Sequence, residues 1–253
     1  MTLNYRLILQ YDGTRYSGWQ KQGNTSNTIQ ERLETLAQEL THVPTDVNGS
    51  GRTDAGVHAL GQVANFRGEV LHRDGTPYSM EEIRDHFNAH LPLDIRVLRV
   101  EPAAPRFHAR LNATSKHYRY VADLGEVPDV FRRRYAASPE SGTYDLQAMR
   151  QAADALLGTH DFRSFCDNKH MKKSTVRTIH DIQVHRDGQF LILDFCGDGF
   201  LYHMVRILTG TLLQVGLGRR QPKEMASILE ARSRAAAGFT APACGLFLVE
   251  VRY

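Results

Sequence analysis

Cysteine, proline and long apolar stretches are scarce in this chain of 253 residues, and each scarcity excludes a class of protein. The three cysteines are odd in number, far apart and never in a CxxC pair, so we expect neither a disulfide framework nor a zinc cage. Nine prolines and 20 glycines are too few for a collagen or a low-complexity protein. No apolar run approaches the roughly 18–20 residues that cross a bilayer, and the first residues lack the apolar core of a signal peptide. We therefore expect a cytoplasmic protein without a membrane segment.

Charge is nearly balanced over the whole chain but unevenly distributed along it. Lys and Arg number 31 against 28 for Asp and Glu, which gives a formal net charge of +3. The positive excess lies in the second half and gathers in three clusters, Arg132 to Arg134, Lys169 to Lys173 and Arg219-Arg220. Such clusters can bind a nucleic-acid backbone, since each Lys or Arg neutralises a phosphate. A solvated surface is the more common explanation of such runs.

Hydrophobic periodicity predicts two halves of the same architecture. The first half has strand, helix, strand, strand, helix and strand patterns at residues 3–11, 29–40, 45–49, 61–67, 79–90 and 95–100. The second half repeats the order, with strands at 116–124, 178–185, 190–195 and 245–253 and helices at 145–157, 202–215 and 222–232. This is the order of the split βαβ unit, an α/β (α+β) fold with mainly antiparallel sheets. Prolines at residues 101–105 are expected to stop regular structure there, which predicts domains 1–104 and 105–253.

The segment NGSGRTDAGVHAL, residues 48–60, concentrates groups that carry chemistry. Gly49, Gly51 and Gly56 permit unusual backbone angles and the close approach of another segment. The same stretch holds the polar residues Arg52, Thr53, Asp54 and His58. A loop on a rigid scaffold commonly carries catalytic groups, although a Gly-rich turn in which Asp54 caps a backbone N–H is the alternative. The segment has neither the GxGxxG nor the GxxxxGK[ST] pattern of a phosphate loop, and we expect His58 to form hydrogen bonds rather than bind metal.

The sequence GRTDAGVHA resembles the catalytic motif of tRNA pseudouridine synthases of the TruA family. Six further segments resemble that family in the same order: YDGTRYSGWQKQ, TIQERLE, FHARLNATSKHYRY, HDFRSF, FLYHMVRILTG and GLFLVEVRY. The resemblance spans almost the whole chain. Two stretches, 71–78 and 168–177, match no motif of the family.

The resemblance implies an enzyme that isomerises uridine to pseudouridine at positions 38, 39 and 40 in the anticodon stem-loop of tRNA. It implies no metal, nucleotide or organic cofactor. It also implies two ferredoxin-like (RRM-like) halves whose sheets join across a central cleft, and a homodimer. The N-terminal domain would carry the catalytic Asp loop, and the C-terminal domain the basic loops and the helix with Arg206.

The matching motifs imply roles for five residues. Asp54 matches the family's essential aspartate, which either attacks C1′ of the ribose or removes a proton from C2′; the residues leave both routes open. Arg206 matches the arginine that pairs with this aspartate, with a structural ion pair or a phosphate contact as the alternative. Tyr118 matches the tyrosine that stacks on the target base and can relay the C5 proton, with a place in the sheet core as the alternative. Arg52 is expected to contact phosphate or replace a flipped base, and Leu246 to wall the uracil pocket; a surface salt bridge and ordinary packing are their alternatives.

Two other classes of protein share parts of this pattern. Tandem α/β units also occur in RNA-binding proteins without catalysis, but these carry an RNP1 pattern that the sequence lacks. A hydrolase of glycosidic bonds needs a second carboxylate opposite Asp54, and the loop contains none.

Overall fold

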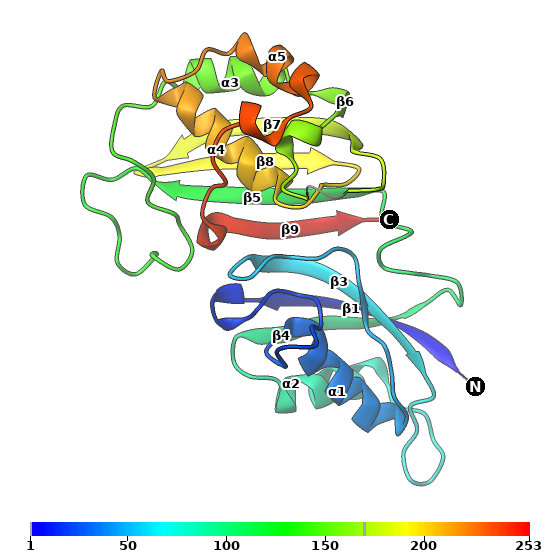
Figure 1. Ribbon diagram of the computed structural model, residues 1–253. Helices are drawn as coiled ribbons and strands as arrows, with labels where there is room; N and C mark the ends of the chain where they lie inside the picture. The colour runs from blue at the N-terminus through cyan, green and yellow to red at the C-terminus, as the bar shows by residue number, and fades with distance from the viewer. Residues whose placement is uncertain (1, 169–170) are drawn as a thin grey trace. The chain divides into compact units, whose positions relative to one another are not determined.

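A computed structural model describes residues 2–168 and 171–253 (Figure 1). Within these residues the chain forms nine β-strands and five α-helices, so the predicted mixed α/β class with mainly antiparallel strands is confirmed. Its contacts divide into two compact units: unit 1 comprises residues 1–114 and 248–253, and unit 2 comprises residues 115–247. The predicted domains, 1–104 and 105–253, stay a prediction. In the observed grouping the segment 105–114 and the last six residues belong to unit 1.

Unit 1 is a split βαβ unit. Its elements are β1 (Leu3–Tyr11), η1 (Gly13–Arg15), α1 (Ile29–Thr41), β2 (Asn48–Gly49), β3 (His58–Gly68), α2 (Met80–His90) and β4 (Ile95–Ala103). The strands pair in the order β4-β1-β3, with β2 also on β3, and all of these pairs are antiparallel. The predicted order of elements is thereby confirmed, although the second strand has two residues instead of five.

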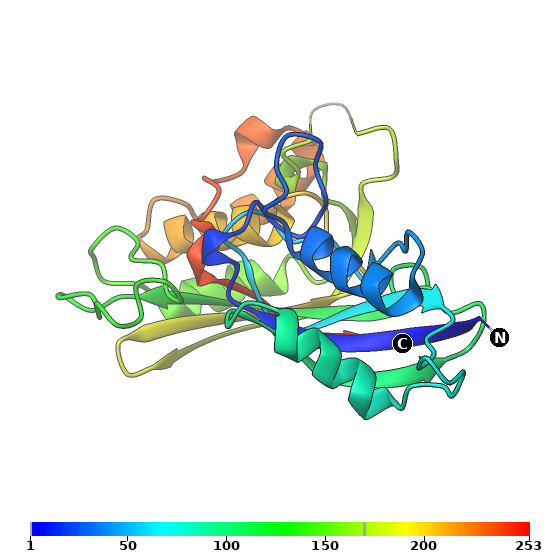
Figure 2. The ribbon, with the colours of Figure 1, turned by 90° about the horizontal axis from the view of Figure 1, so that it is seen from below.

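Local sequence explains where the two helices of unit 1 begin. The Thr28 side chain accepts a hydrogen bond from the Glu31 N–H at 3.2 Å and so caps α1. Ser79 and Glu82 form a capping box at the start of α2. Both helices lie on the same face of the sheet (Figure 2), where Phe87 of α2 packs on Phe66 of β3. Burial of this apolar layer leaves the strand ends and loops to carry polar groups.

The expectation that prolines stop regular structure at residues 101–105 is wrong for residues 101–103. Strand β4 continues through Pro102, which pairs with Tyr5 of β1, to Ala103. Proline has no N–H to donate, but β4 is the outermost strand of the sheet and pairs with β1 on one side. The missing donor therefore costs no ladder hydrogen bond on the other side.

Unit 2 contains four paired strands covered by helices. Its elements are β5 (Ser115–Asp123), α3 (Leu146–Asp154), β6 (Gly158–Asp161), η2 (Arg163–Phe165), β7 (Val176–Asp187), β8 (Phe190–Gly197), α4 (Met204–Gly216), α5 (Glu224–Ala231), η3 (Arg234–Ala236) and η4 (Ala243–Gly245). The strand order is β5-β8-β7-β6, and α3, α4 and α5 lie on one face of this sheet (Figure 1). The predicted hairpin is present as β7 and β8, with Gly188 at a φ of +57° in its turn. Strand β6 was not predicted.

The closing strand β9 (Leu246–Arg252) belongs to both units, since its first two residues group with unit 2 and the rest with unit 1. Within the described part of the chain, no helix is long and apolar enough to span a membrane.

Candidate active site

The predicted catalytic loop, residues 50–57, connects β2 to β3 within unit 1. Ser50 begins the loop, where its N–H donates to the Val63 carbonyl of β3 at 2.7 Å. The Ser50 hydroxyl donates to Oε1 of Gln62 at 2.6 Å, and the Gln62 amide donates to the Gly51 carbonyl at 3.1 Å. The first half of the loop is therefore fastened to the strand that follows it.

A buried hydrogen-bonded group holds the residue before Asp54. Thr53 is 6% exposed, and its hydroxyl lies 2.8 Å from the Tyr11 hydroxyl. The Gln62 amide donates to the same Tyr11 oxygen at 3.3 Å. Burial raises the pKa of Tyr11 to about 12, so the phenol stays neutral and can both donate and accept. This group ties Thr53 to the end of β1.

Two glycines bring the segment 13–19 against the catalytic loop. A Cβ at Gly13 would lie 1.9 Å from the Val57 carbonyl oxygen, and one at Gly18 would lie 2.7 Å from that of Thr53. Gly18 also has a φ of +90°, which L side chains rarely adopt. The Trp19 N–H donates to the Thr53 carbonyl at 3.0 Å. The segment YDGTRYSGWQKQ thus packs against the GRTDAGVHA loop and supports its backbone.

Sequence reasoning did not assign this supporting role to Tyr11, Gly13, Gly18 or Trp19. It used their segment only as evidence of family resemblance. The two glycines close to a tryptophan were the available signal, because small residues beside a large one permit close packing. Their partner segment lies far along the chain, so no local pattern connects the two.

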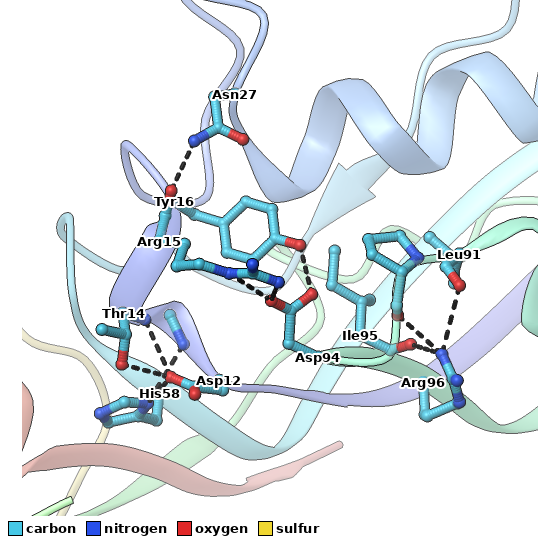
Figure 3. A network of polar contacts seen from close by, with 12 residues as sticks. Asp12, Thr14, Arg15, Tyr16, Asn27, His58, Leu91, Asp94, Ile95 and Arg96 are labelled. Atoms are coloured by element: carbon cyan, nitrogen blue, oxygen red, sulfur yellow. Dashed lines mark hydrogen bonds and ion pairs between the residues drawn. The ribbon is translucent and has the colours of Figure 1, made fainter. Parts of the chain in front are cut away.

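A second polar network holds the segment 12–16 (Figure 3). Nδ1 of His58 accepts from the Gly13 N–H at 3.1 Å and lies 3.1 Å from Oδ1 of Asp12. Asp94, at the start of β4, accepts from Nη2 of Arg15 at 2.6 Å and from the Tyr16 hydroxyl at 2.5 Å. The predicted hydrogen-bonding role of His58 is in accord with this contact.

Asp94 is ionised in this network. Burial alone would raise its pKa, but the hydrogen bonds from Tyr16 and Arg15 hold the pKa of this carboxyl below its usual value. Its main-chain carbonyl also accepts from the Asp12 N–H at 2.9 Å. Asp94 therefore fixes both ends of the turn over residues 12–16.

Asp54 itself lies half-buried at the middle of the loop. Its carbonyl accepts from the Val57 N–H at 3.1 Å, which closes a turn, and Gly56 within that turn has a φ of +79°. Arg52, two residues earlier, is exposed. The loop backbone is therefore held on both sides of Asp54.

Tyr118 is part of the sheet core of unit 2. It lies in β5 opposite Phe195 of β8, and the residue is 7% exposed. Its ring meets the edge of Phe200 with centroids 5.2 Å apart and planes at 81°. The place in the sheet core that the sequence left as an alternative is therefore observed, and the role in base stacking stays a prediction.

Arg206 lies near the start of α4 and is half-buried. Its Nε donates to the Ala241 carbonyl at 2.7 Å, and its own carbonyl accepts from the Ala241 N–H at 3.1 Å. One edge of the guanidinium is thus anchored to the backbone of residue 241.

Leu246 is 5% exposed and is the first residue of β9. It follows η4, where a Cβ at Gly245 would lie 2.5 Å from the Val121 carbonyl oxygen. The Tyr120 hydroxyl donates to the Pro242 carbonyl at 2.9 Å, just before this turn. Leu246 is therefore held in place by close packing of the preceding turn, and ordinary packing and a role in the uracil pocket both stay open.

The basic clusters differ in how far their side chains are occupied by internal contacts. The Arg132 guanidinium lies 4.8 Å from the Phe190 ring centroid, and Arg219 pairs with Glu140. Arg220 donates to Gln214 and to the Ala236 carbonyl. Lys172 and Lys173 are exposed. Lys169 and His170, also in the predicted cluster, lie outside the described residues.

Among residues 2–168 and 171–253 no three His, Cys, Asp or Glu side chains are grouped as ligands for a metal ion. Asp54 and Arg52 belong to unit 1, and Tyr118, Arg206 and Leu246 belong to unit 2. Unit 1 thus provides a carboxylate on a rigid loop, and unit 2 provides an anchored guanidinium and a buried aromatic ring.

Comparison with known proteins identifies the class to which this arrangement belongs. A family model described as tRNA pseudouridine synthase matches residues 7–112 and 152–253, so the chain belongs to that family. A tRNA pseudouridine synthase A of Bacillus sp. (strain KSM-64) is 42% identical over 250 residues, which cover 99% of each chain. Relatives with the same name in Acetivibrio thermocellus and Exiguobacterium sp. (strain ATCC BAA-1283 / AT1b) are 42% and 45% identical and cover 99% and 98% of this chain. The matched regions cover 99% and 97% of the lengths of these two relatives.

Proposed function

We propose that this protein isomerises uridine to pseudouridine at positions 38, 39 and 40 in the anticodon stem-loop of tRNA. Uridine isomerisation in tRNA is the activity of the family to which the chain belongs. The observation that carries the proposal is the loop of Asp54, whose backbone is fixed on both sides by buried contacts while Asp54 itself is half-buried. A carboxylate held in this way meets the geometric demand of reaction at a sugar carbon.

The reaction breaks one bond to C1′ of the ribose and forms another. The N1–C1′ bond of uridine breaks, the uracil turns over, and a C5–C1′ bond forms. The proton on C5 is lost, and N1 gains a proton, so the product is an isomer of the substrate. Cleavage develops positive charge at C1′, which an ionised carboxylate stabilises. Asp54 supplies this carboxylate, either by attack on C1′ or by removal of a C2′ proton.

The other residues act on the carboxylate and on the base. Arg206 is the cation that we assign to the Asp54 carboxylate, since a guanidinium can hold both oxygens and fix their direction. Its Nε donates to the Ala241 carbonyl, which fixes the orientation of the guanidinium plane. Tyr118 stacks on the target base and relays the C5 proton.

Arg52 and Leu246 are assigned to substrate binding. Arg52 is exposed on the catalytic loop, where it can contact phosphate or occupy the space of a flipped base. Leu246 packs against the uracil. The proposal also includes a homodimer, a cytoplasmic location, where tRNA is modified, and a reaction that requires no metal or organic cofactor.

Release of tritium from uracil C5 tests the proposal. The substrate is tRNA labelled with tritium at C5 of uracil, and the assay contains EDTA and dialysed enzyme. Isomerisation releases the label as water, whereas binding alone releases nothing and hydrolysis leaves an abasic site. We expect release by the wild-type protein and less than roughly a hundredth of that rate for Asp54→Asn, because the amide keeps the shape of the side chain and loses its charge. No release by the wild type, or an active Asn variant that binds tRNA normally, would contradict the proposal.

A further inference from the structure

Tyr202 and His203, immediately before α4, form an exposed aromatic stack in unit 2. Their ring centroids lie 3.8 Å apart and their planes are inclined by 26°. Tyr202 is 53% exposed, whereas the His203 side chain is 18% exposed. The imidazole therefore covers one face of the phenol ring and leaves much of the tyrosine in solvent. An exposed ring supported from beneath is a suitable surface for another flat ring.

A carboxylate keeps the lower ring of this stack in place. Nδ1 of His203 lies 2.7 Å from Oδ2 of Asp167. Asp167 also accepts from Nε of Arg234 at 2.6 Å and from the Thr240 hydroxyl at 3.1 Å. The Asp167 N–H donates to the Tyr202 carbonyl at 3.3 Å. Three side chains and one main-chain bond thus hold the two rings.

The backbone of His203 is strained. Its φ of +61° lies in the left-handed region, which costs a residue other than glycine about 1–2 kcal/mol. Such strain persists where the surroundings impose it, and it is concentrated at functional sites. Here it turns the imidazole under Tyr202 at the first turn of α4, three residues before Arg206. The stack is therefore built into the start of the helix that carries the proposed catalytic guanidinium.

Two arginines, Arg177 and Arg234, lie beside the segments that carry the stack. The Arg177 side chain lies 3.6 Å from the position of a Cβ on Gly199. Arg234 supports Asp167, and the exposed Lys172 and Lys173 follow Asp167 closely in the chain. An aromatic face among basic side chains suits a nucleotide, since the ring takes the base and the cations take the phosphate. The combination favours single-stranded RNA over an apolar peptide.

We propose that Tyr202, supported by His203, is a stacking platform for one unpaired nucleobase of the RNA substrate outside the target position. This inference rests on the proposed function. Phe200, two residues earlier, contacts Tyr118, so the platform is continuous in sequence with the residue assigned to the target base. Every base has a π face, so stacking holds a nucleotide without selecting its identity. An enzyme that modifies three successive positions requires contacts of this kind.

Three substitutions at one position test the platform. Tyr202→Phe keeps the π face, Tyr202→Leu keeps apolar bulk without it, and Tyr202→Ala removes both. Leu93→Ala, at a residue of unit 1 that is 90% exposed, is the control for loss of an exposed apolar side chain. Stacking is worth about 1–3 kcal/mol per base, which corresponds to roughly five- to 150-fold in affinity. We expect KM for tRNA to rise by that factor in the Leu and Ala variants, with kcat nearly unchanged, and to stay within about threefold of wild type in the Phe and Leu93 variants.

A binding measurement separates the platform from a structural role. Stem-loop RNAs with the fluorescent base 2-aminopurine at one loop position at a time are titrated with each variant. Quenching at one position that persists with Tyr202→Phe and disappears with Tyr202→Leu supports stacking. Equal KM and equal quenching in the Phe and Leu variants would overturn the proposal, as would a fall in kcat alone, which would assign Tyr202 to the fold of the helix start. A wild-type protein that binds and quenches but releases no tritium would contradict the proposed function and leave the platform standing.

Discussion

Substitution of Gly18 by alanine is expected to lower kcat, although this residue is not among those assigned to the substrate. A Cβ on residue 18 would lie 2.7 Å from the Thr53 carbonyl oxygen and 3.1 Å from the carbonyl carbon of Asp54. Both atoms belong to the backbone, so no side-chain rotation relieves the clash. Ordinary contact begins at 3.4 Å, so the peptide before Asp54 must move by about 0.7 Å. The substitution therefore displaces the proposed catalytic carboxylate.

The size of the effect follows from the precision that the reaction requires. Misplacement of a reacting group by about 1 Å can cost roughly a hundredfold in rate. A shift of about 0.7 Å is then expected to lower kcat by roughly ten- to a hundredfold. The positive φ of residue 18 adds about 1–2 kcal/mol of strain for alanine, which lowers the free energy of unfolding. Stability and catalysis should both decrease, for different reasons.

Gly75→Ala is the matched control because it carries the strain without the clash. Gly75 has a φ of +84°, close to the +90° of Gly18, and a Cβ there would meet nothing within 4 Å. Gly75→Ala should lose the free energy of unfolding that the strain costs, and Gly18→Ala should lose at least as much, because the clash adds to the same strain. Only Gly18→Ala should lose kcat, measured by single-turnover formation of pseudouridine at saturating tRNA. Equal kcat values in two folded variants would refute the argument that the position of this loop controls the rate.

Three other measurements test the site and its surroundings. Arg206→Lys keeps the charge but replaces a planar guanidinium by one mobile ammonium. We expect the single-turnover rate to fall by about a hundredfold, nearly as much as in Arg206→Ala. A Lys variant near the wild-type rate would make Arg206 only a source of charge. The folded pKa of Asp94 is lowered, so its contribution to stability is complete above the ordinary Asp value of about 4 and is lost as the pH falls through the folded pKa. The free energies of unfolding of wild type and Asp94→Asn, measured by chemical denaturation, should accordingly differ by a constant amount between about pH 5 and 8 and by less in stronger acid. A difference that does not change with pH in acid would exclude an ionised Asp94. Replacement of Lys172 and Lys173 by glutamine should lower the slope of log affinity for tRNA against log salt concentration by about one unit for each phosphate that is no longer neutralised. Arg219→Gln, at a residue paired with Glu140, should leave this slope unchanged. Equal slopes in the wild type and both variants would make Lys172 and Lys173 ordinary solvated surface.

Periodicity and capping residues in the sequence determined the element order of unit 1 and that of unit 2 apart from strand β6. The alternating apolar residues of β1 and the capping residues Thr28 and Ser79 act through neighbours a few positions away, so a local reading detects them. The motif around Asp54 likewise pointed to the loop that we propose to be catalytic. Pro102 misled that reading, because a proline is permitted or forbidden according to whether its strand lies at the edge of a sheet.

The tertiary structure alone decided which residues hold the loop in place. Thr53 is bound by Tyr11 and Trp19, and Gly13 and Gly18 make room for the approach of two segments that lie far apart in the chain. A glycine that faces open solvent, such as Gly75, and one pressed against a carbonyl, such as Gly18, look the same in sequence. The difference arises from distances across the fold, because steric contact and hydrogen bonding depend on which atoms meet in space. Periodicity along the chain carries no information about these contacts between distant residues.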